Sequence, residues 1–150
     1  MDWPLGVLGI RVSGRGLSGI DFLPAARRVG VPIAPEYQAM IEQLRAYFRD
    51  PSFRFSLRLA LEGTEFERRV WAALRRIPAG TTVTYGTLAI RLGSAPRAVG
   101  RACGANPVPI VIPCHRVVAA DGLGGYMGAN EHGLDVKRWL LDHERARARA

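Results

Sequence analysis

Residues 106–118 read NPVPIVIPCHRVV, a stretch that joins three prolines and an apolar run to a cysteine, a histidine and an arginine in succession. A proline fixes its own backbone angle φ and restricts the residue before it. The prolines at 107, 109 and 113 therefore predict a stiff, extended segment. We expect this segment to present Cys114 in a single conformation, and the rest of the fold to be organised around it.

Two roles are open for Cys114. A free cysteine in an apolar segment is most often a buried structural residue. A thiol with a neighbouring base is, in contrast, the minimum equipment of a nucleophilic site. Because His115 and Arg116 are poor core residues and the prolines hold the approach rigid, we favour a reactive thiol. Adjacent side chains on an extended strand point apart, so the sequence alone does not guarantee contact between Cys114 and His115.

The composition limits the class of protein. A chain of 150 residues, 48% of them hydrophobic, forms one domain, or a large domain with a small lobe attached. The net charge of +8 is uneven, since residues 1–63 carry 8 basic and 6 acidic side chains and residues 64–150 carry 13 and 7. A basic half favours a polyanionic partner such as nucleic acid.

The number of cysteines and the N-terminal sequence indicate the cellular compartment in which we expect the protein. Two cysteines, Cys103 and Cys114, do not make a disulfide scaffold, and a reactive thiol needs reducing surroundings. The N-terminus lacks the basic region of a signal peptide, and we identify no membrane span. The three histidines and two cysteines lack zinc-like spacing. We expect a monomeric cytoplasmic protein with no metal, no cofactor and no membrane contact.

The first 63 residues predict a small sheet and one helix. Two short strands over 5–12 and 16–23 flank a glycine-containing turn. Apolar residues at helical spacing predict an amphipathic helix over 36–49. Alternation of apolar and polar side chains over 53–61 predicts a half-buried strand.

The remaining residues read as mostly helical. Thr64 and Glu67 form a capping-box pattern, which predicts a helix running to about Ile77. We expect Thr84 to cap a short helix over 85–92, and Ser94 to cap a second one over 95–105. Two short helices joined by a glycine-containing turn form a helix-turn-helix, a motif that occurs in many DNA-binding proteins.

The second helix of this pair has unusually small side chains. Gly100 and Gly104 alternate with alanines, and Arg97 and Arg101 lie one turn apart. The minor groove of DNA is only about 6 Å wide, so a thin helix is what could enter it. The alternative is that small residues allow close packing of helices. A last helix over 133–147 places Lys137, Leu141 and Glu144 on one face.

The run Pro-Cys-His-Arg-Val at 113–117, preceded by Asn106-Pro107 and an apolar run, resembles the active-site motif of the O6-alkylguanine-DNA alkyltransferases. The similarity runs from about Thr64 to Glu144 and extends more weakly back to Pro4. It implies an α/β (α+β) fold with a small N-terminal lobe, residues 1–63, built from a short antiparallel sheet plus a helix. Residues 64–150 would form a mostly helical domain with the helix-turn-helix and the active-site loop.

The resemblance also implies a function in DNA repair. The alkyl group of O6-alkylguanine in double-stranded DNA, with O4-alkylthymine as a further candidate, would pass directly and once to Cys114. The implied catalytic residues are Cys114, His115, Glu144, Asn106 and Tyr85. A water would bridge the thiol and His115, Glu144 would hold the histidine, Asn106 would brace the turn, and Tyr85 would protonate the leaving guanine.

The resemblance further implies minor-groove docking, with Arg97 filling the stack where a nucleotide has been turned out. The other implied DNA contacts are Ala98, Arg101, Ala105, Thr84 and Ser94. The implied pocket for the extruded base comprises Val117, Tyr126, Met127 and Lys137, with Lys137 polarising the base near O6.

Two features depart from the family pattern, and three other readings stay open. Met127 stands where a small or hydroxyl residue is usual, and the loop 127–136 is longer than usual. The first rival is a DNA-binding protein without transfer activity, which the presence of Cys114 disfavours. A thiol hydrolase leaves the thin helix unexplained, and a plain helix-turn-helix regulator leaves the Pro-Cys-His-Arg motif unexplained.

Overall fold

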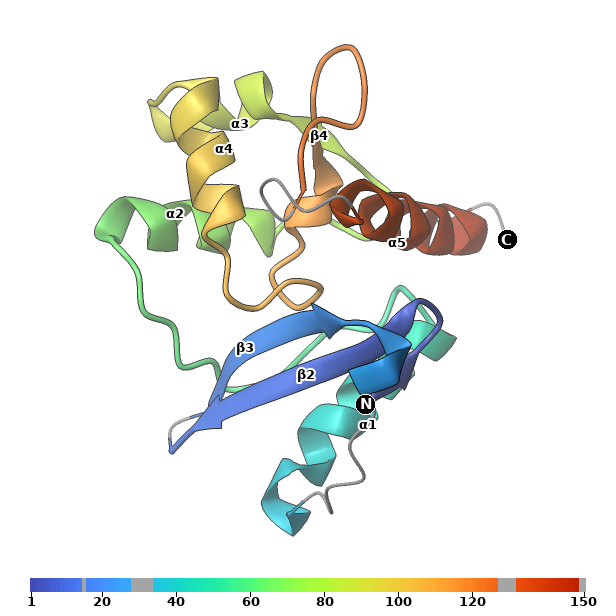
Figure 1. Ribbon diagram of the computed structural model, residues 1–150. Coiled ribbons are helices and arrows are strands. Elements are labelled where there is room, and N and C mark those ends of the chain that lie inside the picture. The colour runs from blue at the N-terminus through green and yellow to red at the C-terminus, as the bar shows by residue number, and fades with distance from the viewer. Residues whose placement is uncertain (15, 28–33, 127–131, 149–150) are drawn as a thin grey trace. The chain divides into compact units, whose positions relative to one another are not determined.

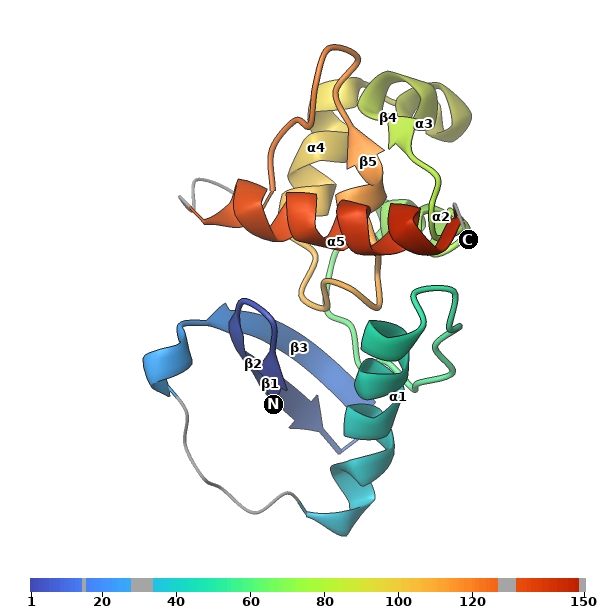
Figure 2. The same cartoon turned by 90° about the vertical axis from the view of Figure 1, so that its right-hand side faces the viewer.

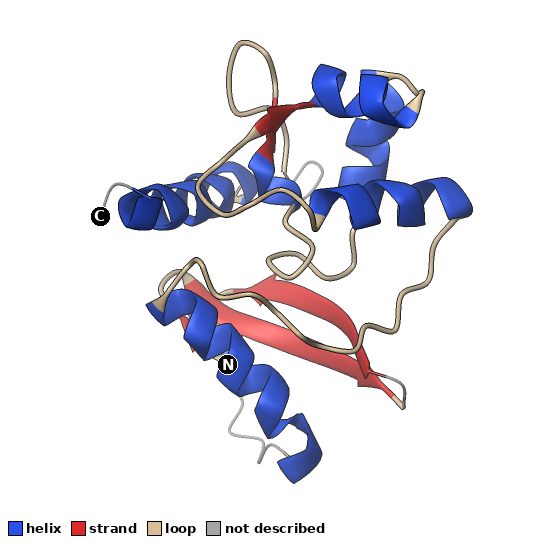
Figure 3. Ribbon diagram, turned by 180° about the vertical axis from the view of Figure 1, so that it is seen from behind, coloured by secondary structure: helices blue, strands red, loops and turns tan. Residues whose placement is uncertain are grey.

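The structure, a computed structural model, describes residues 1–14, 16–27, 34–126 and 132–148. The chain divides into two units, Met1–Leu61 and Glu62–Ala150. The division drawn from the sequence, between residues 63 and 64, falls two residues further along. Figure 3 shows that extended strands dominate the first unit and helices the second.

The first unit is built on a three-stranded antiparallel sheet in the order β1-β2-β3. Its strands are β1 (Asp2–Trp3), β2 (Gly6–Ser13) and β3 (Gly16–Leu23), and β2 and β3 form the hairpin in Figure 1. The two strands predicted from the sequence are confirmed to within one residue at each end. The two-residue strand β1 is too short to show a period in the sequence and was not predicted.

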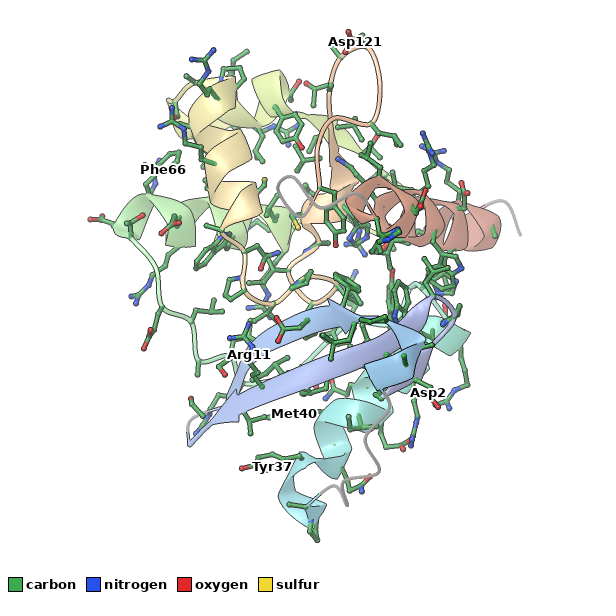
Figure 4. The ribbon with its side chains drawn as sticks, in the orientation of Figure 1. Asp2, Arg11, Tyr37, Met40, Phe66 and Asp121 are labelled. Atoms are coloured by element: carbon green, nitrogen blue, oxygen red, sulfur yellow. The ribbon has the colours of Figure 1, made fainter. Side chains whose placement is uncertain are left out.

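Helix α1 (Gln38–Arg49) follows two short 3-10 turns, Ala25–Arg27 and Pro35–Tyr37. It buries Ile41, Leu44 and Tyr47, which fall on the face expected from the helical spacing. Trp3 of β1 joins the helix to the sheet, because its ring lies 5.3 Å from that of Phe22 and 5.9 Å from that of Phe48. Figure 4 labels Tyr37 and Met40 at the N-terminal end of this helix.

The strand predicted over 53–61 has the expected alternation in burial but pairs with the sheet only near Leu59, so it is not a full strand of the sheet. Exposure does alternate along it, with half-buried Phe53 and Phe55 flanking exposed Arg54. Among the described residues, its one β-bridge joins Leu59 to Leu17 of β3. The side chain of Gln43 on α1 instead accepts a hydrogen bond from the backbone N–H of Ser56 at 2.9 Å. A helix side chain thus replaces a neighbouring strand, which an alternating pattern cannot reveal.

The second unit begins with α2 (Glu65–Leu74), whose capping box is confirmed. The backbone N–H of Glu67 donates to Thr64 Oγ1 at 3.1 Å, and the N–H of Thr64 donates to Glu67 Oε1 at 2.8 Å. The helix ends three residues before the predicted end at Ile77. Its largest fully buried side chain is Trp71, whereas Phe66 is half-buried.

Two short helices follow the strand β4 (Val83–Thr84), namely α3 (Tyr85–Leu92) and α4 (Pro96–Gly104). Thr84 caps α3 as predicted, by accepting a hydrogen bond from Thr87 N at 3.1 Å. Gly93 ends α3 at φ 63°, in the left-handed region that favours glycine. The predicted cap at Ser94 is wrong, because Ala95 is the N-cap of α4 and no side chain caps it. Pro96 at the first position reduces the need for such a cap.

Strand β5 (Val117–Val118) pairs in parallel with β4, and α5 (Gly133–Ala148) closes the unit. Figure 2 shows α5 running across the face of this unit that carries β5. The loop after β5 carries Asp121 at its tip (Figure 4). Within the described ranges, no helix has the length and apolar character that crossing a membrane requires.

Candidate active site

Residues 106–118 form a compact turn, so the prediction of an extended segment is wrong. Ile110 adopts φ 76° and reverses the chain, which brings Pro109 and Ile112 into a bridge. A β-branched residue at positive φ is strained, and such strain persists only where the surroundings fix it. Ile110 is 1% exposed. The prolines limit the backbone on both sides of this reversal, and Cys114–Arg116 then form a 3-10 turn.

Asn106 holds the turn together through its side-chain amide. Its Oδ1 accepts a hydrogen bond from Val108 N at 2.9 Å, and its Nδ2 donates to Ile112 O at 2.8 Å. The same Nδ2 lies 3.2 Å from Cys114 Sγ, as a donor to the sulfur. One side chain therefore fixes both ends of the turn and the position of the thiol.

His115 is fully buried and lies against a carboxylate from α5. Its Nε2 is 2.6 Å from Glu144 Oε1. Since an ionised carboxylate only accepts hydrogen bonds, we assign the ring proton to Nε2, which leaves Nδ1 as the unprotonated nitrogen. Nδ1 is also buried and has no hydrogen-bond partner among the described residues.

Arg116 completes the arrangement around Glu144. Its Nε and Nη2 donate to the carboxylate at 2.8–3.2 Å, and its Nη1 donates to Ile77 O at 2.5 Å. Burial raises the pKa of Glu144, but hydrogen bonds and charge from His115 and Arg116 outweigh it and lower that pKa to about 2. Burial lowers the pKa of His115, against the opposing effect of Glu144. At neutral pH the pair is therefore a carboxylate and a neutral imidazole.

Cys114 lies at the wall of a cavity of about 430 Å³. The thiol residue is 5% exposed, and burial raises its pKa, while Asn106, Lys137 and Tyr126 act in the opposite direction. A buried thiol with a raised pKa needs a base before it can act as a nucleophile. The cavity is lined by Tyr85, Pro96, Arg97, Gly100, Cys103, Gly104, Cys114, Gly125 and Tyr126.

Four of the residues expected at the site line this cavity: Tyr85, Arg97, Cys114 and Tyr126. The hydroxyl of Tyr85 donates to Gly125 O at 3.4 Å. Burial, with smaller contributions from Cys103 and Cys114, raises the pKa of Tyr85 to about 12, so it stays protonated. Met127, also expected in the pocket, lies outside the described residues.

Val117 and Lys137 were expected in the base pocket, yet neither lines the cavity. Both are fully buried. The Nζ of Lys137 donates to Val117 O at 2.7 Å and to Gly125 O at 2.9 Å. The lysine thus connects α5 with two backbone carbonyls, one on β5 and one on the loop that leads to Tyr126.

The residues expected to contact DNA gather on or next to α3 and α4. Arg97, Arg101 and Ala105 are exposed and Ala98 is half-buried. Thr84 Oγ1 donates to Thr87 Oγ1 at 2.9 Å, and Ser94 lies in the turn between the helices. At Gly100 and Gly104, an added Cβ would meet nothing within 4 Å, so packing inside the unit does not account for either glycine.

Three residues at or near the site were not expected from the sequence. Arg116 stands inside the quoted motif, but nothing in its local pattern indicates a contact with residue 144. Cys103 lines the cavity, and burial raises its pKa to about 12. Trp71 donates from Nε1 to Ala102 O at 2.8 Å and so ties α2 to α4. Within the part of the chain that the structure describes, no group of three or more metal-ligating side chains occurs.

A cysteine facing a cavity, with a histidine and carboxylate pair beside it, is an arrangement typical of proteins that use a thiol as a nucleophile. The basic, small-residue helix α4 along the same cavity adds a surface suited to nucleic acid. A family model described as 6-O-methylguanine DNA methyltransferase, DNA binding domain, matches residues 65–146. The chain belongs to this family.

Known relatives extend the similarity over the whole chain. A methylated-DNA–protein-cysteine methyltransferase of Methanosarcina barkeri is 40% identical over 96% of this chain and 94% of its own length. The Mycobacterium tuberculosis protein of the same name is also 40% identical, over 100% and 93%.

Solved structures agree with these relatives. The crystal structure of Mycobacterium tuberculosis OGT in complex with DNA has a TM-score of 0.83 at 40% identity, covering 98% of this chain and 91% of that one. An O6-methylguanine DNA methyltransferase from Methanococcus jannaschii has a TM-score of 0.70 at 33% identity, covering 97% and 92%. The mixed α/β fold predicted from the sequence is confirmed.

Proposed function

We propose that this chain repairs O6-alkylguanine in double-stranded DNA by transferring the alkyl group once, directly, to Cys114. The observation that carries the proposal is the placement of the Cys114 thiol, which borders the cavity and accepts a hydrogen bond from Asn106. The adjacent His115 is held by Glu144 at 2.6 Å. The relatives at 40% identity carry the name methylated-DNA–protein-cysteine methyltransferase.

His115 acts as the base for the thiol. With Nε2 committed to Glu144, Nδ1 is the nitrogen that can accept a proton. Burial keeps the ring neutral by lowering the pKa of His115, so it is ready to accept that proton at pH 7. We place one water between the thiol and Nδ1 as the carrier, and the resulting imidazolium is stabilised by the ionised Glu144.

The thiolate then displaces guanine from the alkyl carbon. A bond from sulfur to carbon forms, the bond from carbon to O6 breaks, and its electrons pass to the base. Tyr85, which the raised pKa keeps protonated, donates its hydroxyl proton to the leaving guanine. The product is a thioether, which water does not readily cleave. Each molecule therefore acts once.

The thin helix α4 enters the minor groove, and the target nucleotide turns out of the duplex into the cavity. The open surface at Gly100 and Gly104 leaves room for the DNA backbone. Extrusion costs roughly a few kcal/mol, less for a poorly paired damaged base. Arg97, exposed at the start of α4 and bordering the cavity, fills the gap in the stack.

The remaining contacts of this complex come from the same two helices. Arg101, Ala98 and Ala105 on or after α4, with Thr84 and Ser94 at the turns, face the DNA backbone. O4-alkylthymine carries its alkyl group on an equivalent exocyclic oxygen, so we propose it as a second substrate. We further propose that the protein acts as a monomer in the cytoplasm, where its thiols stay reduced.

A duplex carrying one O6-methylguanine tests the function. The wild-type protein should remove the lesion in an amount equal to the protein added, and Cys114→Ser should remove none. Cys103→Ser is the matched control, because it changes the other thiol of the cavity and should still yield a protein methylated at Cys114. Repair by Cys114→Ser, or methylation of Cys103 in the wild type, would refute the assignment of the acceptor.

A further inference from the structure

Lys137 stands apart from every other basic residue of the chain. The 21 basic residues comprise 20 arginines and this one lysine. Lysine differs from arginine in carrying a compact charge that adapts its pKa to burial. The single lysine is also fully buried, with 0% of its surface exposed. Burying a charged side chain is costly, and every other basic residue of this chain is an arginine. We therefore expect a function specific to Lys137.

The contacts of Lys137 place its ammonium behind the cavity wall. Nζ donates to Val117 O at 2.7 Å and to Gly125 O at 2.9 Å. Val117 follows the Cys114–Arg116 turn, and Gly125 lines the cavity next to Tyr126. The ring of Tyr85, whose hydroxyl shares the Gly125 carbonyl, has its centroid 5.7 Å from Nζ. The ammonium therefore fixes two segments that border the thiol.

This geometry disfavours a contact between Lys137 and an alkylated base. The side chain does not line the cavity, and two of its three donors are already used by carbonyls. Its charge can still act on Cys114, because a buried cation near a thiol favours the thiolate. The effect is mutual, since Lys137 lowers the pKa of Cys114 and Cys114 raises that of Lys137.

We propose that Lys137 is a positioning residue, which supplies the buried positive charge that supports the Cys114 thiolate and ties the cavity wall to α5 without touching the base. The consequence for repair rests on the proposed function. The effect on the thiol does not, because it is a property of the free protein.

The other ionisable groups near this charge come from four elements. Tyr85 on α3 and Cys103 on α4 line the cavity, and both have a pKa raised to about 12, so both stay neutral at pH 7. His115 and Arg116 face Glu144 of α5 and share its carboxylate. Burial lowers the pKa of Lys137 to about 8, so its charge persists at pH 7 and its support for the thiolate fades above pH 8.

Alkylation of the free protein by iodoacetamide tests the charge. The measurement uses a Cys103→Ser background, so that Cys114 is the only thiol, and follows the rate from pH 6 to pH 10. We expect Lys137→Met to shift the pH profile of Cys114 upward and to slow alkylation at pH 7 by about tenfold, the effect of one pKa unit. The control Arg138→Met removes a charge from the adjacent, exposed position of α5 and should leave the profile in place.

A Lys137→Met profile that superimposes on the parent, in a protein with an unchanged melting temperature, would overturn the proposal. The thiol assay also separates the two proposals. If the wild-type protein never accepts a methyl group from DNA, the proposed function is refuted. The pH profile of Cys114 alkylation would still test the role of Lys137.

A second measurement needs no change at residue 137. Protein labelled with 15N-lysine gives one side-chain ammonium signal, because the chain has one lysine. In the Cys114→Ser variant bound to O6-methylguanine duplex, we expect the shift and pKa of this signal to match those of unmodified duplex. A shift specific to the alkylated base would show that Lys137 contacts it and would overturn the proposal.

Discussion

Replacing Glu144 by glutamine removes the charge on which the buried part of the site depends. The carboxylate is 1% exposed and accepts from His115 and from two nitrogens of Arg116. Its pKa falls from an ordinary value of 4.5 to about 2. A shift of this size corresponds to about 3 kcal/mol of stability. Breaking a buried ion pair on one side costs a comparable amount, about 3–5 kcal/mol.

The sign of the pH effect follows from the direction of the shift. A carboxylate with a depressed pKa in the folded state stabilises the protein above its unfolded pKa. The contribution is therefore complete at pH 7 and is lost as the pH falls from about 5 toward 2. In Glu144→Gln the free energy of unfolding should not show this loss as the pH falls.

Urea denaturation at a series of pH values measures both effects. We expect Glu144→Gln to lower the free energy of unfolding by about 3 kcal/mol at pH 7. Asp142→Asn, at an exposed position of the same helix, is the control and should change it by no more than about 0.5 kcal/mol. A loss below about 1 kcal/mol for Glu144→Gln, or an unchanged acid dependence, would refute the role given to this carboxylate.

Three further changes test the site and its support. Asn106→Ala removes the hydrogen bonds that hold the turn and Cys114, so it should slow methyl transfer at least about tenfold and lower the melting temperature, as followed by lesion removal and calorimetry. Trp71→Phe keeps an aromatic ring but loses the hydrogen bond to Ala102 O and part of the buried ring volume, which together should cost at least about 1–2 kcal/mol in urea denaturation. Arg101→Ala should reduce the slope of log DNA affinity against log salt concentration by the equivalent of about one phosphate contact. An unchanged slope would show that Arg101 does not contact the DNA.

Local signals in the sequence predicted the elements that depend on local chemistry. The capping box at Thr64 and the cap at Thr84 each need only residues a few positions apart, and both are present. The face of α5 that carries Lys137 and Glu144 follows from helical spacing, and both side chains are buried. Ser94 failed as a cap because Ala95, the next residue, takes that place.

The errors arose where distant residues decide the structure. A β-branched residue such as Ile110 gives no sequence signal for a left-handed conformation, so the sequence predicts an extended segment where residues 106–118 turn. Gln43 satisfies the backbone N–H of Ser56 from another element, and the expected strand pairs with the sheet only near Leu59. The contact of Arg116 with Glu144 joins residues far apart in the chain, and no local pattern predicts it.

The most direct test of the central claim is the intact mass of the protein after mixing with O6-methylguanine duplex DNA. Transfer to the thiol predicts one added CH₂ unit per molecule, mapped by peptide analysis to Cys114, with no further lesion removed once every molecule is modified. Lesion removal that continues beyond one per molecule, or tight binding with no change in mass, would contradict it.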